Sequence, residues 1–346
     1  MESSGTGTPF TSRRELLRWG CGAGLAAVGL GGPVAAAPAA AAAAAAIGDG
    51  RTFMAWRGVT GDQRVFWSEL RDGTWTGPQS VADTYGSSGV ALAGPSNGPL
   101  HMAWKGVEGD QRIWWNRYDG SAWSGPQPVP DAGSSVGPAL APYSGVFMAW
   151  KGIEGDQRIW WNRYVYGQWT PPQQVPDALT SFAPALAVNR IGTYGEPVMA
   201  WKGVDGDQRI WWNTYQGGDS GRNAWTGPLP VAGASTSAGV ALTGPPGGGL
   251  FMAWKGVQGD QRIWWSRLYP GSGAWTAPQP VAGASSGVGP ALAFHGGFVQ
   301  MTWKGVDGDE RIWWSRIHPN SGGWSAPQPV GSAMTAFRPA LGTIGN

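Results

Sequence analysis

The chain writes one seventeen-residue phrase repeatedly. The stretch MAWKGVEGDQRIWWNRY spans Met102–Tyr118 and returns as MAWKGIEGDQRIWWNRY at Met148–Tyr164. Weaker copies begin at Met54, Met199, Met252 and Met301. The aspartate of each copy stands at Asp62, Asp110, Asp156, Asp207, Asp260 and Asp309, in steps of about 50 residues. A period of this length with strand signals predicts a propeller or a similar repeat array.

Each unit contains four strand-like pieces separated by Gly-rich turns. In the third unit these are Gly137–Pro142, Val146–Gly152, Arg158–Tyr164 and Gln168–Val175. Four antiparallel strands make one propeller blade. Small residues in the first piece suit the crowded axis, and prolines in the last piece suit the free edge of a blade.

The two ends of the repeat region predict how the ring closes. The first unit starts at Phe53–Gly58 without a preceding small-residue strand, whereas the chain finishes with such a strand at Arg338–Gly345. We therefore expect the C-terminal strand to lie beside Phe53–Trp56 and to complete the first blade. The predicted fold is all-β, a six-bladed β-propeller of four-stranded blades.

The N-terminal region differs from the repeats and is expected to be a separate segment. Arg13 and Arg14 precede an apolar stretch at 21–34 and an Ala-rich run that ends at Ala46. Twin arginines, an apolar region and an A-x-A-like site are typical of a Tat-type signal peptide. A membrane anchor is the alternative, but the run is short and rich in Gly and Ala. We expect a signal peptide at 1–46, a propeller at 47–346, and a secreted, extracellular mature chain without membrane insertion.

Composition narrows the classes of partner. The net charge is only +2 and no basic run lies outside the first twenty residues, so a nucleic-acid partner is not expected. The single cysteine, Cys21, falls in the predicted signal peptide, which leaves the mature chain without disulfides. The sequence contains 24 tryptophans, enough to supply the apolar area of a large closed domain.

Most tryptophans are predicted to be core. Side chains alternate across a strand, so two adjacent tryptophans can be buried in two different inter-blade interfaces. The second strand of each unit carries one tryptophan as well: Trp56, Trp104, Trp150, Trp201, Trp254 and Trp303. We expect these six, and the second tryptophan of each pair, to be buried.

The first tryptophan of each pair shares a strand face with an arginine two residues earlier, and this pair is the candidate carbohydrate site. The arginines are Arg64, Arg112, Arg158, Arg209, Arg262 and Arg311; the tryptophans are Trp114, Trp160, Trp211, Trp264 and Trp313, with Phe66 in the first unit. An indole can cover the C–H face of a pyranose while a guanidinium donates to its hydroxyls. The alternative is a structural cation–π pair. If sugars bind here, the Phe66 site should be the weakest.

The six aspartates of the Gly-Asp-Gln-Arg turns, Asp62, Asp110, Asp156, Asp207, Asp260 and Asp309, have two readings. An aspartate at such a turn often accepts backbone N–H groups, and it can also bind a ligand. The triplets at Asp205–Asp207 and Asp307–Asp309 hint at calcium, but the other copies change the first position, so no metal site is predicted. We expect no cofactor either.

Enzyme signatures are weak. The histidines His101, His295 and His318 are scattered, and two G-x-S-x-G strings lie in Gly/Ser linkers. A glycosidase needs two carboxylates in unlike environments, whereas the carboxylates here mostly recur in like ones. Catalysis is therefore not expected.

The repeating unit, with PALA, FMAWKG, GDxRIWW and a later W-x-x-P, resembles the propeller lectins of the Aleuria fucose-lectin and Photorhabdus lectin type over about residues 50–345. The resemblance implies a ring of six or seven blades that binds fucose or related sugars between adjacent blades. The residues that match are the arginine and first tryptophan of each third strand. The WW pair and the GDQR turn depart from the family pattern.

These observations favour a secreted, multivalent carbohydrate-binding protein whose partners are glycans on cell surfaces or polysaccharide. A second reading is an interaction scaffold that binds a protein partner in a secreted complex, for which the loops Val188–Pro197 and Tyr215–Trp225 break the repeat. A third, a sialidase- or lyase-like enzyme, requires an asymmetric charged cluster that the sequence does not show.

Overall fold

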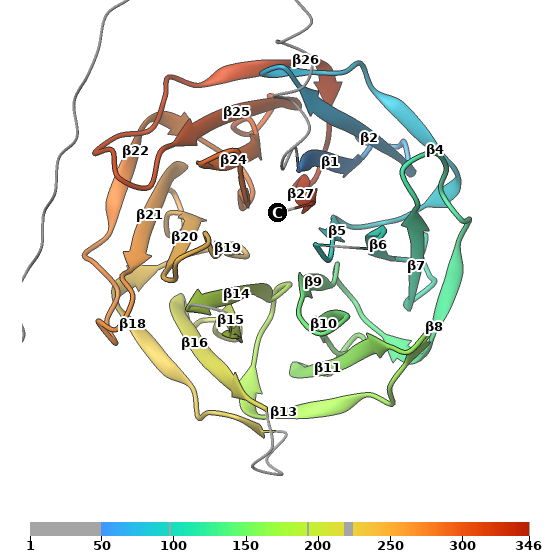
Figure 1. The fold of residues 1–346 in the computed structure, drawn as a ribbon, viewed down its shortest axis with the longest axis horizontal. Coiled ribbons are helices and arrows are strands. Elements are labelled where there is room, and N and C mark those ends of the chain that lie inside the picture. Colours follow the sequence, from blue (N-terminus) through green and yellow to red (C-terminus); the bar gives the residue numbers. More distant parts are fainter. Residues whose placement is uncertain (1–49, 97, 192–193, 218–223, 346) are drawn as a thin grey trace, which may run out of the picture. The chain divides into compact units, whose positions relative to one another are not determined.

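The fold is a closed ring of six β-sheets around a central axis (Figure 1). The computed structural model describes residues 50–345 except 97, 192–193 and 218–223. The predicted signal peptide therefore lies outside the described residues. Among those that are described, no helix has the length and hydropathy needed to cross a membrane. The prediction of an all-β, six-bladed propeller is confirmed.

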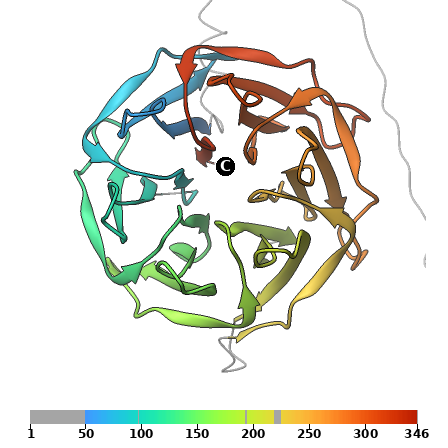
Figure 2. The same cartoon turned by 180° about the vertical axis from the view of Figure 1, so that it is seen from behind.

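Each blade has four main strands, numbered from the axis outward. The innermost strands are β27 (Ala340–Ile344), β5 (Val90–Ala93), β9 (Ala139–Pro142), β14 (Ala185–Ile191), β19 (Ala241–Thr243) and β23 (Ala291–His295). The second strands are β1 (Arg51–Arg57), β6 (Leu100–Lys105), β10 (Val146–Lys151), β15 (Tyr194–Lys202), β20 (Leu250–Lys255) and β24 (Phe298–Lys304). The third are β2 (Arg64–Arg71), β7 (Arg112–Tyr118), β11 (Arg158–Val165), β16 (Arg209–Gln216), β21 (Arg262–Leu268) and β25 (Arg311–Ile317). The outer strands are β4 (Gln79–Tyr85), β8 (Gln127–Gly133), β13 (Gln173–Leu179), β18 (Leu229–Ser235), β22 (Gln279–Ser285) and β26 (Gln328–Met334), which wrap the rim in both views (Figures 1 and 2).

The ring closes as the sequence predicts. β27 pairs antiparallel with β1, from Ala340 opposite Ala55 to Ile344 opposite Arg51. A side-chain bond adds to the closure, because the Thr335 hydroxyl donates to the Arg57 carbonyl at 2.7 Å. The first blade therefore takes its innermost strand from the C-terminal end of the chain.

The outer strand differs from its predicted bounds. The third unit was expected to form one strand at Gln168–Val175, but it forms a short β12 (Gln168–Trp169) followed by β13 (Gln173–Leu179). Pro171 and Pro172 lie between them and supply no N–H group to a ladder, so the strand breaks there. Blades 1 and 4 have similar short pieces, β3 (Thr74–Trp75) and β17 (Ala224–Trp225).

The core consists of apolar clusters between adjacent blades. The second-strand tryptophans Trp56, Trp104, Trp150, Trp201, Trp254 and Trp303 are only 1–2% exposed, as expected. Each such burial contributes roughly 2–3 kcal/mol in area terms. Six large side chains at equivalent positions thus stabilise the ring without disulfides.

Paired tryptophans divide between two interfaces, also as expected. Trp115 is 6% exposed and packs in the cluster shared by blades 2 and 3, whereas Trp114 packs against the cluster shared by blades 1 and 2. The expectation that every second tryptophan is buried is too strong, since Trp212 and Trp265 are half-buried. Period-two alternation predicts the direction of each side chain but not the depth of its interface.

Candidate functional site

The Gly-Asp-Gln-Arg turns join the second and third strands at one end of the ring, here called the GDQR face. In blade 2, Asp110 Oδ1 accepts the backbone N–H of Arg112 at 3.0 Å and its Nε at 2.9 Å. Asp110 Oδ2 accepts Arg112 Nη2 at 3.1 Å and the indole N–H of Trp114 at 2.9 Å. One carboxylate therefore orients both the guanidinium and the indole.

Arg112 also stacks on Trp114, with its guanidinium carbon 4.8 Å from the ring centroid. The sequence predicts that arginine and first tryptophan share a face, and the structure confirms it. We call the aspartate, the arginine and the first aromatic residue of a blade the DRW triad. Its three members come from one turn and the start of one strand, so the local sequence alone assembles it.

The triad recurs around the ring with little variation. The guanidinium-to-ring distances are 5.0 Å at Arg158–Trp160, 4.6 Å at Arg209–Trp211, 4.7 Å at Arg262–Trp264 and 4.8 Å at Arg311–Trp313. The indole N–H donates to the aspartate in each of these blades, at Asp156, Asp207, Asp260 and Asp309. The structure thus brings together every predicted site residue of blades 2 to 6.

Blade 1 has an incomplete triad. Phe66 replaces the tryptophan and has no N–H, so Asp62 keeps only its bonds from Arg64. Arg64 still lies over the Phe66 ring at 5.2 Å. The sequence expectation of a weaker site here now has a structural basis in the lost indole bond.

Electrostatics hold each aspartate in its charged form. The hydrogen bond from Arg112, followed in size by opposing desolvation and by the Trp114 bond, lowers the pKa of Asp110 to about 2. The pKa values of Asp156, Asp207, Asp260 and Asp309 are likewise lowered to about 2, with the neighbouring arginine as the largest cause. The carboxylates are therefore fixed acceptors at neutral pH rather than proton donors.

The arginines remain accessible although they are paired. Their side chains are 48–63% exposed, whereas the aspartates are 18–22% exposed. Within the described contacts, the aspartates use only Nε and Nη2 of each guanidinium, which leaves the Nη1 edge facing outward. Both readings of the Arg–Trp pair are thus compatible with this geometry: it is a structural stack, and it presents a donor at the surface.

A small open cavity lies at one triad, between blades 5 and 6. It measures about 160 Å³ and is lined by Gly283 and Ser285 of β22 and by Trp303, Asp309 and Trp313 of blade 6. This volume is below the 300–1,000 Å³ typical of a drug-sized ligand site. The cavity places a triad where two blades meet, which is the position expected for the sugar sites.

The outer strands bend away beside each triad. In blade 2, β8 pairs with Arg112 through Gly133 and with Trp114 through Pro128, so extra residues bulge out between the two contacts. Asp83, Asp131 and Asp177 occupy these bulges at positive φ of 52°, 54° and 55°. Aspartate tolerates this left-handed conformation better than most residues. Bulges keep the outer edge from covering the triads.

The glutamine of each turn has a role that the sequence leaves open. Gln111 Oε1 accepts the backbone N–H of Glu154 in the next blade at 2.7 Å, and Gln208 does the same to Gln258 at 3.1 Å. In the last blade, Glu310 accepts the N–H and hydroxyl of Thr60. These bonds connect neighbouring turns, so the glutamine contributes to ring geometry.

Sequence reasoning missed a set of buried cations. Each second strand ends in one cation, and these side chains are only 4–8% exposed: Arg57, Lys105, Lys151, Lys202, Lys255 and Lys304. Lys105 Nζ donates to the Ser87 hydroxyl at 2.7 Å and to the Asp110 carbonyl at 3.1 Å. Burial lowers the pKa of Lys105. The signal was present in the sequence, as a charge repeated after every M-A-W or M-T-W.

Comparisons with known proteins agree on the fold. No family model matches the chain, and no curated protein matches it. Among solved structures, AofleA from Arthrobotrys oligospora, in a form with three arginines replaced by alanine, is 11% identical with a TM-score of 0.58, covering 86% of this chain and 90% of that one. A variant of the Aleuria aurantia lectin in complex with Fucα1-6GlcNAc is 18% identical with a TM-score of 0.55, covering 82% and 97%.

A further structure of the Aleuria aurantia lectin, 17% identical with a TM-score of 0.51, is described as a six-bladed β-propeller with a novel fucose recognition mode. At these identities the likeness concerns the fold. The resemblance drawn from the repeat is confirmed at that level: this chain has the six-bladed propeller fold of the fungal fucose lectins.

Proposed function

We propose that this protein is a secreted, multivalent carbohydrate-binding protein that recognises glycans at repeated sites between its blades. The observation that supports this most is the recurrence of one rigid DRW triad around the ring, with its arginine exposed. Near-identical sites in a ring suit multivalent binding, in which several weak contacts add to one strong attachment. The lectins of the same fold support the assignment of sugar as the ligand class.

Each triad offers the chemistry that a sugar requires. The exposed guanidinium edge donates to ring hydroxyls, and its aspartate fixes its direction before the ligand arrives. The half-buried indole of the first tryptophan adds an apolar edge. Because the cavity between blades 5 and 6 is small, each site would hold about one sugar residue and bind it weakly. Fucose and related sugars are the first candidates, by analogy with the structural neighbours.

The test is glycan-array binding by the mature chain, residues 47–346, beside a variant with Arg112→Ala, Arg158→Ala and Arg209→Ala. A matched control removes the same charge from the far ends of third strands, with Arg117→Ala, Arg163→Ala and Arg316→Ala. Loss of multivalency predicts a decrease of about tenfold or more in the first variant only. Equal binding by both variants would move the sites away from the triads, and no binding to any glycan would overturn the proposal for the sugars tested.

A comparison of single variants tests which blades contribute. Arg112→Ala should weaken binding more than Arg64→Ala, because only the former removes a guanidinium held beside an indole that shares its aspartate. Titration of each variant against an immobilised glycan found on the array gives the two affinities. A larger loss for Arg64→Ala would show that the Phe66 blade, rather than the tryptophan blades, carries recognition.

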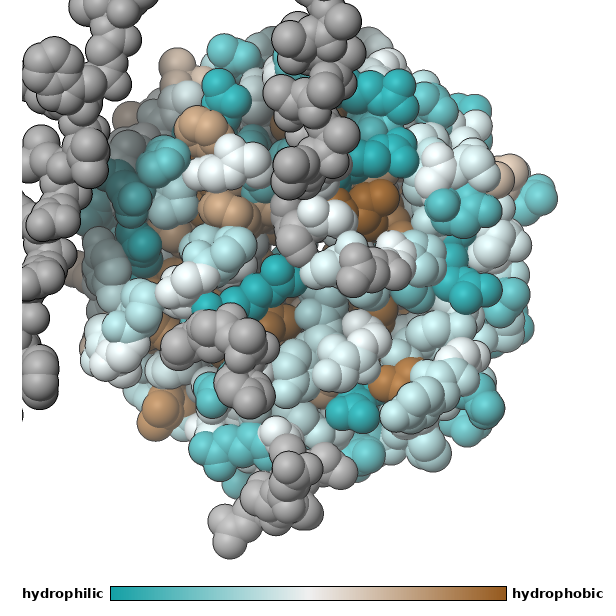
Figure 3. All heavy atoms as spheres, viewed as in Figure 1, coloured by the Kyte–Doolittle hydropathy of each residue, from teal (hydrophilic) through white to brown (hydrophobic). Residues whose placement is uncertain are grey.

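A protein-binding scaffold is the second candidate, and one observation favours it. The β14–β15 turn is bounded by the pair Ile191 and Tyr194, and the β16–β17 connection is bounded by Gln216 and Ala224. Both leave blade 4 at the end opposite the GDQR face. On the face seen in Figure 3, however, the described apolar residues are scattered between polar ones. Large protein-binding sites usually gather such residues into a patch.

A further inference from the structure

One residue breaks the symmetry of the central channel. Arg338 precedes the innermost strand β27, where the other five blades have Gly89, Gly137, Ala183, Gly239 and Gly289. Its side chain runs across the axis, since Nη1 donates to the Val240 carbonyl of blade 5 at 2.8 Å. The small residues make room for it: a Cβ added at Gly239 would lie 3.4 Å from Nη1, and one at Gly289 3.5 Å from Cδ.

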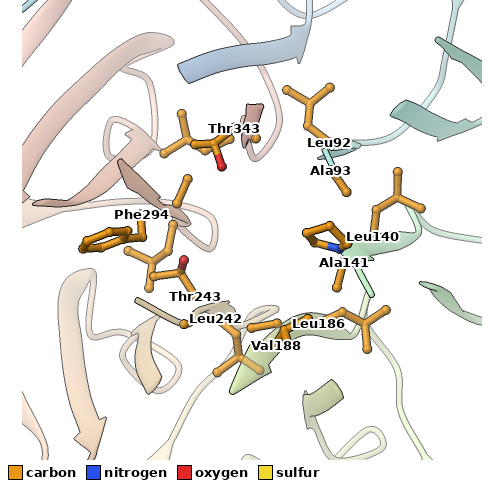
Figure 4. Close-up of a pocket in the computed structure, with 18 of the residues that line it drawn as sticks. Leu92, Ala93, Leu140, Ala141, Leu186, Val188, Leu242, Thr243, Phe294 and Thr343 are labelled. Atoms are coloured by element: carbon orange, nitrogen blue, oxygen red, sulfur yellow. The ribbon is translucent and has the colours of Figure 1, made fainter. Parts of the chain in front are cut away.

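Beneath Arg338 the channel forms a small chamber. Its volume is about 60 Å³, and its lining is alanine, leucine, valine and proline apart from Arg338. Six leucines separate it from a second cavity of about 90 Å³ towards the opposite face: Leu92, Leu140, Leu186, Leu242, Leu292 and Leu341. Figure 4 shows several of these side chains arranged around the axis. About 60 Å³ accommodates a few waters or one small ion, and excludes a sugar ring.

The charge of Arg338 is uncompensated within the part of the chain that the structure describes. No carboxylate lies within ion-pair distance of it there, and burial lowers its pKa to about 10. A charge withdrawn from water is costly unless a counter-charge meets it. Val240 supplies only a neutral acceptor.

The surroundings add positive charge rather than cancel it. The six buried cations lie at the same end of the ring, and their described hydrogen bonds go to carbonyl and hydroxyl oxygens. Lys105 reaches Ser87, two residues before Gly89, and a Cβ on Gly89 would lie 3.1 Å from the Arg338 carbonyl. The cations are therefore one linker away from the channel, and their fields add at its mouth.

We infer that the chamber beneath Arg338 is a binding site for a small monovalent anion, of which chloride is the common example. The guanidinium holds the anion from one side, and the leucine ring bounds it on the other. An anion there offsets the charge of Arg338 and fixes the residue that crosses the channel from blade 1 to blade 5. The inference is independent of sugar binding.

Bromide, as a probe for chloride, tests the site in the full-length mature chain. Thermal unfolding is followed from zero to a few hundred millimolar sodium bromide, with sodium gluconate keeping the ionic strength constant. The expected result is a saturable rise in melting temperature of a few degrees. Arg338→Gly, which restores the residue of most other blades, should lose the rise, while Arg316→Ala, an exposed arginine with the same charge loss, should keep it.

A crystal grown in bromide gives the independent readout, an anomalous peak within hydrogen-bond reach of the Arg338 guanidinium. Arg338→Lys, which retains the charge, serves if Arg338→Gly does not fold, and it should keep a weakened bromide response. A peak without any bromide-dependent stabilisation would mean an adventitious ion only and would overturn the proposal. So would equal bromide responses in the wild type and Arg338→Gly, or no peak at Arg338.

Discussion

At the scale of the residue, the same position can carry different chemistry in different blades. His101 lies where blades 3 and 5 have Phe147 and Phe251, and it stacks on Trp115 at 6.0 Å and 9°, just as Phe147 stacks on Trp161 at 9°. The imidazole differs by its nitrogens. Nδ1 donates to the Pro99 carbonyl, and Nε2 has no partner among the described atoms. Desolvation lowers the pKa of His101 to about 4, so the folded protein keeps this ring neutral.

This predicts a specific acid sensitivity. Because the folded-state pKa of His101 is below the unfolded value near 6.5, the unfolded chain binds more protons between these values, and stability falls as the pH drops from about 6.5 to about 4. The slope from one group is at most about 1.4 kcal/mol per pH unit. His101→Phe should flatten the curve of unfolding free energy over this range. An unchanged slope in denaturant titrations at pH 4.5 and 7 would contradict the prediction.

At the scale of the element, the strand that closes the ring packs differently from its equivalents. β27 has Gly342 where the other innermost strands carry Ala93, Ala141, Ala187, Thr243 and Ala293. A Cβ at Gly342 would lie 2.6 Å from the Leu92 Cβ and 3.2 Å from Leu100 Cδ1. β27 and β5 are therefore closer than a side chain allows, which is a property of this seam.

Gly342→Ala should therefore destabilise the protein, although alanine is the usual residue at this place. Overpacking costs about 1–3 kcal/mol when neighbours must shift. The reverse change in β9, Ala141→Gly, should cost about 0.5–1 kcal/mol through backbone entropy. Guanidinium titrations of both variants give the two free energies, and a smaller loss for Gly342→Ala would show that β27 can move away from β5.

Strand order and ring closure could be predicted from the sequence because they rest on repeat spacing and on small residues near the axis. Strand ends could not be: Pro171 and Pro172 split the outer edge of blade 3, and tertiary pairing extends β13 to Leu179. The triad members were found, but the bond from the indole to the aspartate depends on turn geometry. Arg338 was read only as the start of a strand, since nothing local to it reveals which side chains surround the axis.

At the scale of the whole molecule, the triads form a second source of acid sensitivity. Five aspartates have folded pKa values lowered to about 2, chiefly by their arginines. A lowered carboxyl pKa stabilises the fold above the unfolded value near 3.8, and this contribution disappears as the pH falls towards 2. The histidine and aspartate windows thus adjoin without overlapping.

The melting temperature should accordingly fall between about pH 4 and pH 2, in both the wild type and His101→Phe. Calorimetry across pH 2–7 separates the two windows, since the variant should differ only above about pH 4. Asp156→Asn combined with Arg158→Gln removes one ion pair with little change in shape, and it should reduce the lower-pH decline. A melting temperature that does not change between pH 4 and pH 2 would show that the triads add nothing to stability.

The pairing of β1 with β27 has a consequence for the timing of biogenesis. Arg51 emerges from the ribosome long before its partner Ile344, so the first blade waits for most of the chain to be synthesised. Contacts this distant in sequence form slowly, and an unpaired strand edge invites wrong partners meanwhile. During synthesis β1 is thus an exposed edge that molecular chaperones have reason to cover, until the closing strand arrives and the ring loses its free end.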